Sequence, residues 1–282
     1  MKFWTKVNLD SSPHPFRLAD RIVLMGSCFA DSIGARLVAA GFDAMVNPFG
    51  TLYNPSSLLS AVRRLDSNEY FGPSDCVEMG AGAGMICSFE HHTSFARPTA
   101  ESFLENANKA LEQARDFWKT ANRVILTLGT SMIWCAGGRT VSNCLKRPAA
   151  EFTRRMLEVE ESRSCIQSII DAHPEKSFLV TVSPIRHLGD GAHANTISKS
   201  RLILAADACQ GADYFPAYEI LNDELRDYRF YADDLVHPST AATDYIWECF
   251  TLALTAPEER ARMAENEKAA RRKAHRSILN DK

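Results

Sequence analysis

Short apolar runs alternate with helical patterns along most of this chain, and the alternation limits its fold more than any other feature. The runs lie at residues 21–25, 44–47, 123–128, 177–182 and 213–215, and turn residues bound them. Runs that are nearly continuous in apolar residues are typical of strands in a parallel sheet covered on both faces. The sequence therefore predicts an α/β fold with helices on both sides of a parallel sheet.

Helical spacing between the runs supports this prediction. One helix is expected after the first strand and should end at Gly41, because glycine readily takes the left-handed conformation that closes a helix. Two further helices are expected, one before the third strand and one before the fourth. The three apolar faces are formed by Ala30, Ile33, Leu37 and Ala40, by Leu104, Ala107, Leu111, Ala114 and Trp118, and by Phe152, Met156, Val159, Ile166 and Ile169.

The alternating pattern fits a single domain over residues 1–256, although a chain of 282 residues could also form two small domains. Two stretches depart from it. We expect residues 66–100 to form an excursion or small β element, and residues 135–150 to form a long loop over the sheet edge. Residues 257–282 are highly charged and are expected to form a solvated helix or a frayed tail.

Composition and charge narrow the function classes. Apolar residues make up 45% and charged residues 24% of the chain, which is ordinary for a soluble globular protein with a sizeable core. The net charge of −3 gives no reason to expect a nucleic-acid partner. The N-terminal residues lack the apolar core of a secretory signal, and no uncharged stretch is long enough to span a membrane. We expect a cytoplasmic protein.

Eight cysteines are dispersed along the chain with no Cys-x-x-Cys pair. Zinc sites are therefore not expected. Cysteines inside apolar stretches, such as Cys165 and Cys249, behave as small hydrophobic residues. We interpret the set as reduced thiols of a cytosolic protein.

A hydroxyl and an acid-base pair lie far apart in the sequence. Ser27 follows the first predicted strand directly and precedes a helix, while Asp234 lies three residues before His237. Acyl transfer through serine requires such an inventory: a nucleophile, an imidazole base and a carboxylate that orients the base. Asp233 competes with Asp234 for the orienting role. A serine at this junction can also be a simple helix N-cap.

Cys28 adjoins Ser27 and raises a thiol alternative. Its position at a helix N-terminus lowers a thiol pKa, which favours the reactive thiolate. A cysteine mechanism would require the histidine to be aimed one residue further along the chain.

The residues Gly26-Ser27-Cys28-Phe29-Ala30 resemble the signature of the GSCFA family, a group within the SGNH, or GDSL-like, hydrolase superfamily. The resemblance extends over roughly residues 20–250 and continues in blocks at residues 47–55, 127–131, 142–144, 181–188, 214–219 and 227–231. It implies a three-layer α/β/α domain with a flavodoxin-like parallel sheet. It also implies a Ser-His-Asp triad of Ser27, His237 and Asp234, with the backbone amides of Ser27 and Gly50 as oxyanion donors.

The third oxyanion donor of that superfamily is missing from its usual place. The expected Gly-x-Asn-Asp reads Gly129-Thr130-Ser131-Met132 here. A hydroxyl or amide at Thr130 or Ser131 would have to replace the asparagine, or Asn143 would have to reach over from the next loop.

Other polar residues have open roles. Arg186 could hold an anionic substrate group or pair with a structural carboxylate. His187 could line the pocket or brace a loop. His91 and His92, near Cys87, could be proposed as metal ligands, but no fourth ligand has a suitable spacing, so packing roles are expected.

The resemblance and the residues together predict a serine-dependent ester hydrolase acting on a small-molecule or carbohydrate ester. No metal or cofactor is expected, because acyl transfer through serine requires none. An O-acyltransferase with the same site and a non-catalytic ligand-binding protein are the alternatives. If a neutral His237 is the base, kcat/KM should rise with pH through the range of an ordinary imidazole, about 6 to 7.

Overall fold

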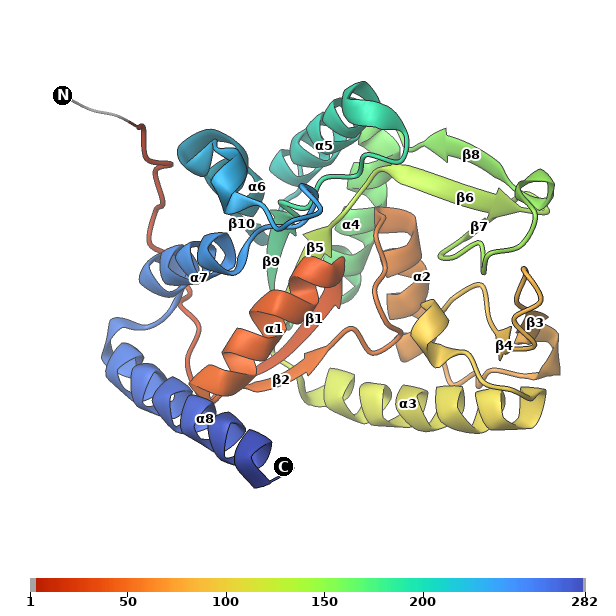
Figure 1. The fold of residues 1–282 in the computed structure, drawn as a ribbon, viewed down its shortest axis with the longest axis horizontal. Coiled ribbons are helices and arrows are strands. Elements are labelled where there is room, and N and C mark those ends of the chain that lie inside the picture. The colour runs from red at the N-terminus through yellow and green to blue at the C-terminus, as the bar shows by residue number, and fades with distance from the viewer. Residues whose placement is uncertain (1–3, 281–282) are drawn as a thin grey trace.

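A five-stranded parallel sheet forms the centre of the protein (Figure 1), whose structure is a computed structural model that describes residues 4–280. The strand order is β10-β9-β5-β1-β2, and every neighbouring pair is parallel. Along the chain this is the 2-1-3-4-5 order of flavodoxin-like sheets. The predicted fold is confirmed. The strands are β1 (Arg21–Gly26), β2 (Asp43–Val46), β5 (Arg123–Leu128), β9 (Ser177–Val182) and β10 (Ala212–Phe215).

The register brings the carboxyl ends of the three central strands to one edge. Gly26 lies opposite Thr127, and Leu128 lies opposite Val182. The residues that follow these strands, from Ser27, Gly129 and Ser183 onward, therefore meet at the edge where parallel sheets of this kind bind ligands.

Successive side chains of the strands point to opposite faces, so each face of the sheet packs against its own set of helices. In β1, Val23 and Met25 belong to one core, and Ile22 and Leu24 belong to the other. Helices contribute buried side chains to each core. The first core contains α2 (Pro55–Asp66), α3 (Ala100–Thr120), α4 (Val159–Ala172) and α5 (Gly191–Asp207), and the second contains α1 (Cys28–Ala40) and α7 (Thr240–Leu254).

Helix α1 begins and ends as its sequence predicts. Ser27 is its N-cap, and Gly41 closes it with φ of 100° while its amide donates to the carbonyls of Leu37 and Val38. The predicted apolar face, which includes Ile33 and Leu37, is buried in the second core.

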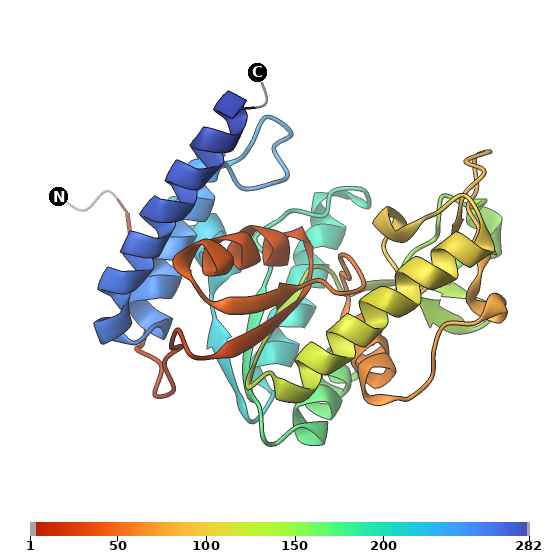
Figure 2. The ribbon, with the colours of Figure 1, turned by 90° about the horizontal axis from the view of Figure 1, so that it is seen from below.

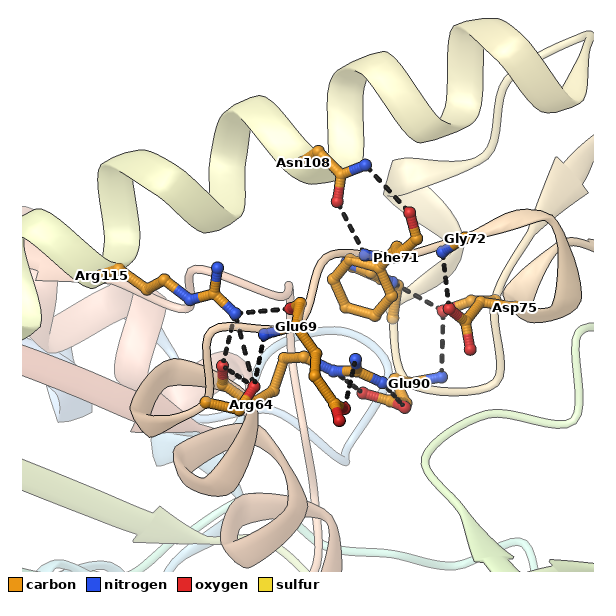
Figure 3. Close-up of polar contacts among 11 residues, drawn as sticks. Arg64, Glu69, Phe71, Gly72, Asp75, Glu90, Asn108 and Arg115 are labelled. Atoms are coloured by element: carbon orange, nitrogen blue, oxygen red, sulfur yellow. Dashed lines mark hydrogen bonds and ion pairs between the residues drawn. The ribbon is translucent and has the colours of Figure 1, made fainter.

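The excursion after α2 contains a small antiparallel ladder, as expected. Strands β3 (Val77–Glu78) and β4 (Ile86–Cys87) pair there, flanked by the 3-10 turns η1 (Pro73–Asp75) and η2 (Thr93–Phe95). Figure 3 shows the polar contacts that hold it. Arg64 donates to both carboxylate oxygens of Glu90, and Arg115 donates to the carbonyls of Arg64 and Glu69. The side chain of Asn108 accepts the amide of Phe71 and donates to its carbonyl.

The long loop predicted at residues 135–150 is corrected in part, because residues 135–136 and 139–141 lie in strands of a second small sheet. Strands β6 (Met132–Ala136), β7 (Arg139–Val141) and β8 (Thr153–Met156) form it, with β6 in the middle. Gly137 and Gly138 both have positive φ, which a tight two-residue hairpin turn requires. The helix predicted to include Phe152 and Met156 begins only at Val159, because residues 153–156 pair with β6 instead.

The charged C-terminal segment is a helix that packs against the domain. After η6 (Pro257–Glu259), α8 (Arg260–Asn280) lies beside α1 (Figure 1 and Figure 2). Met263 is buried in the second core, and Asn266 donates to the carbonyl of Ala40. Residues 1–3 and 281–282, the ends of the two predicted regions, lie outside the described residues.

Short helical turns complete the fold. They are η3 (Ala149–Glu151), α6 (Ala217–Glu219), the π-helical turn η4 (Ile220–Leu225) and η5 (Tyr228–Phe230). Within residues 4–280, none of the helices combines the length and the apolar character that a bilayer-crossing segment needs.

Candidate active site

Asp234 and His237, distant from β1 in sequence, lie together at the carboxyl edge of the sheet. The Oδ2 atom of Asp234 is 2.6 Å from Nδ1 of His237. The other carboxylate oxygen accepts the backbone amides of Val236 and His237, each at 2.9 Å. These two amides, His237 first, and then the imidazole lower the pKa of Asp234 to about 2. The carboxylate is therefore ionised at neutral pH and holds one nitrogen of the ring.

The other ring nitrogen of His237 faces a thiol. Its Nε2 atom lies 3.6 Å from the Sγ atom of Cys28, within the range of a hydrogen bond to sulfur. Sequence reasoning placed this histidine against Ser27, whereas the structure places it against the next residue. In the described part of the chain, no hydrogen bond joins the Ser27 hydroxyl to the imidazole.

Ser27 has a local structural role that explains this difference. Its backbone is extended, with φ of −69° and ψ of 173°, and its hydroxyl accepts the amide of Phe29 as the N-cap of α1. The residue is only 2% exposed. A Cβ atom added to Gly129 would lie 3.3 Å from the Ser27 Cβ, so the serine is packed against the end of β5. Cys28 begins the helix and is the half-buried residue that meets His237.

Opposing effects act on the Cys28 thiol. Burial is the largest and raises its pKa above the ordinary value of 9.0, with a smaller contribution from the charge of Asp31. The backbone amides of Cys28 and Phe29 and the charge of Lys199 oppose this rise in pKa. Because burial dominates, the resting group at neutral pH is the thiol, and a base is needed to form the thiolate.

Lys199 is a fully buried amine beneath the site. It comes from α5, is 1% exposed, and donates through Nζ to the carbonyls of Gly129 at 2.6 Å and Ser183 at 2.7 Å. These carbonyls lie at the ends of β5 and β9. No carboxylate of residues 4–280 forms an ion pair with it, and burial lowers its pKa to about 7, an effect that the charge of Cys28 partly opposes.

The model of the GSCFA family matches residues 21–250. The chain belongs to the GSCFA family. The GSCFA motif spans the junction at which Ser27 caps the helix and Cys28 meets the histidine.

Comparison with solved structures gives distant likenesses to the GSCFA protein. A psychrotrophic esterase EstA from Pseudoalteromonas sp. is 10% identical with a TM-score of 0.39, covering 83% of this chain and 96% of its own. A putative platelet activating factor from Streptococcus pneumonia is 13% identical with a TM-score of 0.41, covering 83% and 84%. A carbohydrate esterase family 2 enzyme from Corynascus thermopiles is 14% identical with a TM-score of 0.39, covering 87% and 68%.

Likeness at this level identifies no shared activity. Comparison with curated proteins finds no match.

The backbone amides predicted to bind the oxyanion are both engaged in the GSCFA protein. The Ser27 amide donates to the carbonyl of Thr127 at 3.1 Å, and the Gly50 amide donates to the carbonyl of Asn47 at 2.7 Å. Gly50 is nevertheless a required glycine, because its φ is +76° and an added Cβ would lie 2.4 Å from the Cβ of His92. The Cys28 amide lies in the first turn of α1, where an amide has no intrahelical acceptor.

The three residues considered as the third donor also have local partners. Thr130 and Ser131 are buried, and both hydroxyls bond the hydroxyl of Ser198 on α5. The side-chain oxygen of Asn143 accepts the amide of Leu145 in a turn. The hydroxyls therefore tie the end of β5 to α5, and Asn143 shapes its own loop.

Arg186 and His187 lie in the same loop after β9 and contact different parts of the protein. The Arg186 amide donates to the carbonyl of Val236, and its Nη1 atom donates to the carbonyl of Leu235, both at 3.1 Å. It therefore braces the loop that holds Asp234 and His237. His187 lies 3.6 Å from Asp190, and its amide donates to Asn195 of α5. Burial lowers the pKa of His187.

His91 packs inside the protein as expected. It lies among the rings of Phe49, Phe71, Phe95 and Phe103, and burial lowers its pKa to about 3. Across the described residues, no group of three or more His, Cys, Asp or Glu side chains is arranged to hold a metal ion.

Sequence reasoning missed Lys199 and Tyr53. A lysine in a helix is usually solvated, so nothing in the local pattern of α5 signals burial. Tyr53 follows the Gly50 turn, and its hydroxyl contacts Thr51 at 3.1 Å. Burial raises its pKa, and the charge of Cys28 adds to the rise, so the two side chains interact.

Proposed function

We propose that this GSCFA protein hydrolyses acyl esters through Cys28, with His237 as the general base and Asp234 as the residue that orients the base. The observation that carries the proposal is the continuous chain of contacts from Sγ of Cys28 to Nε2 of His237 at 3.6 Å and from Nδ1 to Asp234 at 2.6 Å. Nucleophile, base and orienting carboxylate in this order make up the arrangement that activates a nucleophile.

The reaction proceeds in two steps. In the first, His237 takes the thiol proton, the sulfur forms a bond to the acyl carbonyl carbon, and the alcohol leaves with that proton from the imidazole. In the second, His237 takes a proton from water, the hydroxide attacks the thioester, and the carboxylic acid leaves as Cys28 is reprotonated. Atoms and protons balance without a cofactor, and Asp234 stabilises the imidazolium in both steps.

The surroundings of Cys28 support attack by the sulfur. Burial keeps the thiol protonated at rest, so proton transfer to His237 accompanies the attack. The α1 amides and the buried amine of Lys199 lower the free energy of the thiolate that then forms. We assign the Cys28 amide as a donor to the oxyanion, because it lies at the nucleophile and in the first turn of the helix.

Water access favours hydrolysis over transfer to a second alcohol. The side chains of His237 and Asp234 are 47% and 49% exposed, so water can approach the base. A transferase instead excludes water from its acyl-enzyme, because water would hydrolyse the intermediate before the acceptor attacks. We also propose a cytoplasmic location, where a nucleophilic thiol stays reduced.

Trapping of the acyl-enzyme tests the proposal. Incubation with p-nitrophenyl acetate, followed by peptide mass mapping, should find acetyl on Cys28 in the wild type and in Ser27→Ala, and none in Cys28→Ala. Iodoacetamide should block turnover, and a fluorophosphonate probe should not label Ser27.

Other results would favour the rival functions. Acetyl on Ser27, or fluorophosphonate labelling that Ser27→Ala abolishes, would restore the serine mechanism. Absence of both an adduct and turnover would indicate a non-catalytic binding protein. Acylated acceptor in preference to free acid, when a carbohydrate alcohol is added, would indicate an O-acyltransferase.

A further inference from the structure

A cavity of about 200 Å³ lies beside the loop that carries His237 and Asp234. Its lining includes Arg186, Asn222, Arg226, Tyr228 and Tyr231. A volume of this size admits a small polar group rather than a whole drug-sized ligand.

The cavity lining contacts the loop that carries the candidate catalytic pair. Arg186 donates to the carbonyls of Leu235 and Val236, the two residues before His237. On the other strand of the same loop, Tyr231 forms a bridge with Pro238, and the amide of Ala232 donates to the carbonyl of His237 at 2.8 Å. A group bound in the cavity would therefore lie against residues that hold the loop of His237.

The charges around the cavity leave one guanidinium available. Asp227 also lines it but pairs with Arg229 at 3.0 Å, and Arg226 pairs with Asp223 at 3.4 Å. Arg186 forms no ion pair with any carboxylate of the described chain. Its only side-chain acceptor there is the carbonyl of Leu235, which occupies one of the five N–H donors of a guanidinium.

Aromatic contact holds this guanidinium in place. The Cζ atom of Arg186 lies 5.5 Å from the ring centroid of Tyr231, whose hydroxyl is bonded to Asn222 at 3.2 Å. A guanidinium held on a ring and by one backbone carbonyl is oriented before a ligand arrives, and its free edge matches a carboxylate or a phosphate with two parallel hydrogen bonds.

We infer that Arg186 and this cavity form a subsite for an anionic group, so that the preferred substrate is an ester bearing a carboxylate or a phosphate. The inference rests on the proposed function for the reaction but not for the binding. No carboxylate of the described residues pairs with Arg186. Of the two roles open to it, this leaves the binding of an anionic substrate group.

Kinetics with matched esters test the preference. Wild type should turn over p-nitrophenyl hydrogen succinate with a higher kcat/KM than neutral p-nitrophenyl butyrate. Arg186→Gln should lower the ratio of the two values about tenfold, the worth of one charge-assisted pair. Because loss of the brace on Leu235 slows both esters alike, the ratio reports the subsite and not the loop. Arg139→Gln, at an exposed arginine of β7, is the matched control and should leave the ratio unchanged.

Direct binding separates this inference from the proposed function. Inorganic phosphate and succinate are titrated separately into the full-length wild type and into Arg186→Gln, with the arginine Nε–Hε NMR signals as the readout. A saturable shift of the Arg186 signal, together with loss of saturable binding in the variant, supports the subsite even if no ester is hydrolysed. The stronger of the two anions identifies the preferred group. Equal binding to wild type and variant, or an unchanged kinetic ratio, would overturn it.

Discussion

The Nε2 atom of His237 lies 3.6 Å from the Sγ atom of Cys28. Ser27, one residue earlier, is buried and uses its hydroxyl to cap α1. A single junction between strand and helix therefore determines which of two adjacent side chains faces the imidazole.

Replacement of the two adjacent side chains should have opposite effects. Cys28→Ala should lower kcat/KM for p-nitrophenyl acetate by at least about 10³-fold, because no attacking atom remains. Ser27→Ala should keep kcat/KM within about tenfold while the free energy of unfolding falls by about 1 kcal/mol, the usual cost of a lost N-cap. Steady-state kinetics and urea unfolding measure both. A folded but inactive Ser27→Ala beside an active Cys28→Ala would contradict the assignment.

The rate of Cys28 alkylation should depend on pH and on Lys199. The thiolate is the reactive form, and burial raises the pKa of Cys28 above 9.0, so the rate with iodoacetamide should still be rising at pH 9. Lys199 carries its charge mainly below its pKa of about 7, so Lys199→Met should slow alkylation below about pH 7 and leave it unchanged near pH 9. Lys109→Met, at an exposed lysine of α3, is the control. Superimposable curves for all three proteins, read by peptide mapping of Cys28, would rule out the electrostatic role.

Lys199 should also make stability depend on pH. Its pKa is about 7 in the folded protein against an ordinary 10.5, so the unfolded chain binds more protons between these values. The unfolding free energy of wild type, relative to Lys199→Met, should therefore increase as pH rises from about 7 to about 9. Urea unfolding at several pH values measures the difference. A difference that stays constant over this range would mean that the amine is not desolvated in the folded state.

Asp234 should matter for catalysis and Asp233 should not. Asp234→Asn keeps an acceptor for the amides of Val236 and His237 but cannot stabilise the imidazolium, so kcat/KM should fall by roughly 100-fold or more. Asp233→Asn, the matched neighbour, is exposed and should change kcat/KM by less than about threefold, in line with a surface substitution. Equal losses in the two variants would show that the pair is wrongly identified.

Gly50 should be more sensitive to substitution than a glycine with similar backbone conformation. Gly50→Ala and Gly137→Ala both place an L residue at positive φ, which costs about 1 kcal/mol. Only at Gly50 does the new Cβ meet another side chain, that of His92 at 2.4 Å. The unfolding free energy should therefore fall by at least about 1 kcal/mol more for Gly50→Ala. Similar losses for the two variants would mean that the loop of His92 moves aside freely.

Local pattern was sufficient for the central fold. Strands β5 and β9 lie where the apolar runs place them, and α1 ends at Gly41 as its backbone preference indicates. Local pattern gave wrong predictions where pairing with a neighbouring strand overrides the helical spacing of apolar residues. Residues 153–156 join β6 in a sheet although Phe152 and Met156 have helical spacing. The Gly137-Gly138 turn, which joins β6 to β7, lies within the predicted loop.

Sequence by itself also determined that the carboxyl edge of the parallel sheet carries the polar residues, because strand direction follows from the alternation with helices. It determined as well that Asp234 and His237 are close enough along the chain to pair. Only the tertiary structure decided that the imidazole of His237 meets the thiol of Cys28 and that the amine of Lys199 lies beneath the site. The direction of a side chain at a strand-to-helix junction depends on the backbone angles of one residue, and the burial of Lys199 depends on how α5 docks against the ends of β5 and β9. Neither quantity is a property of local sequence.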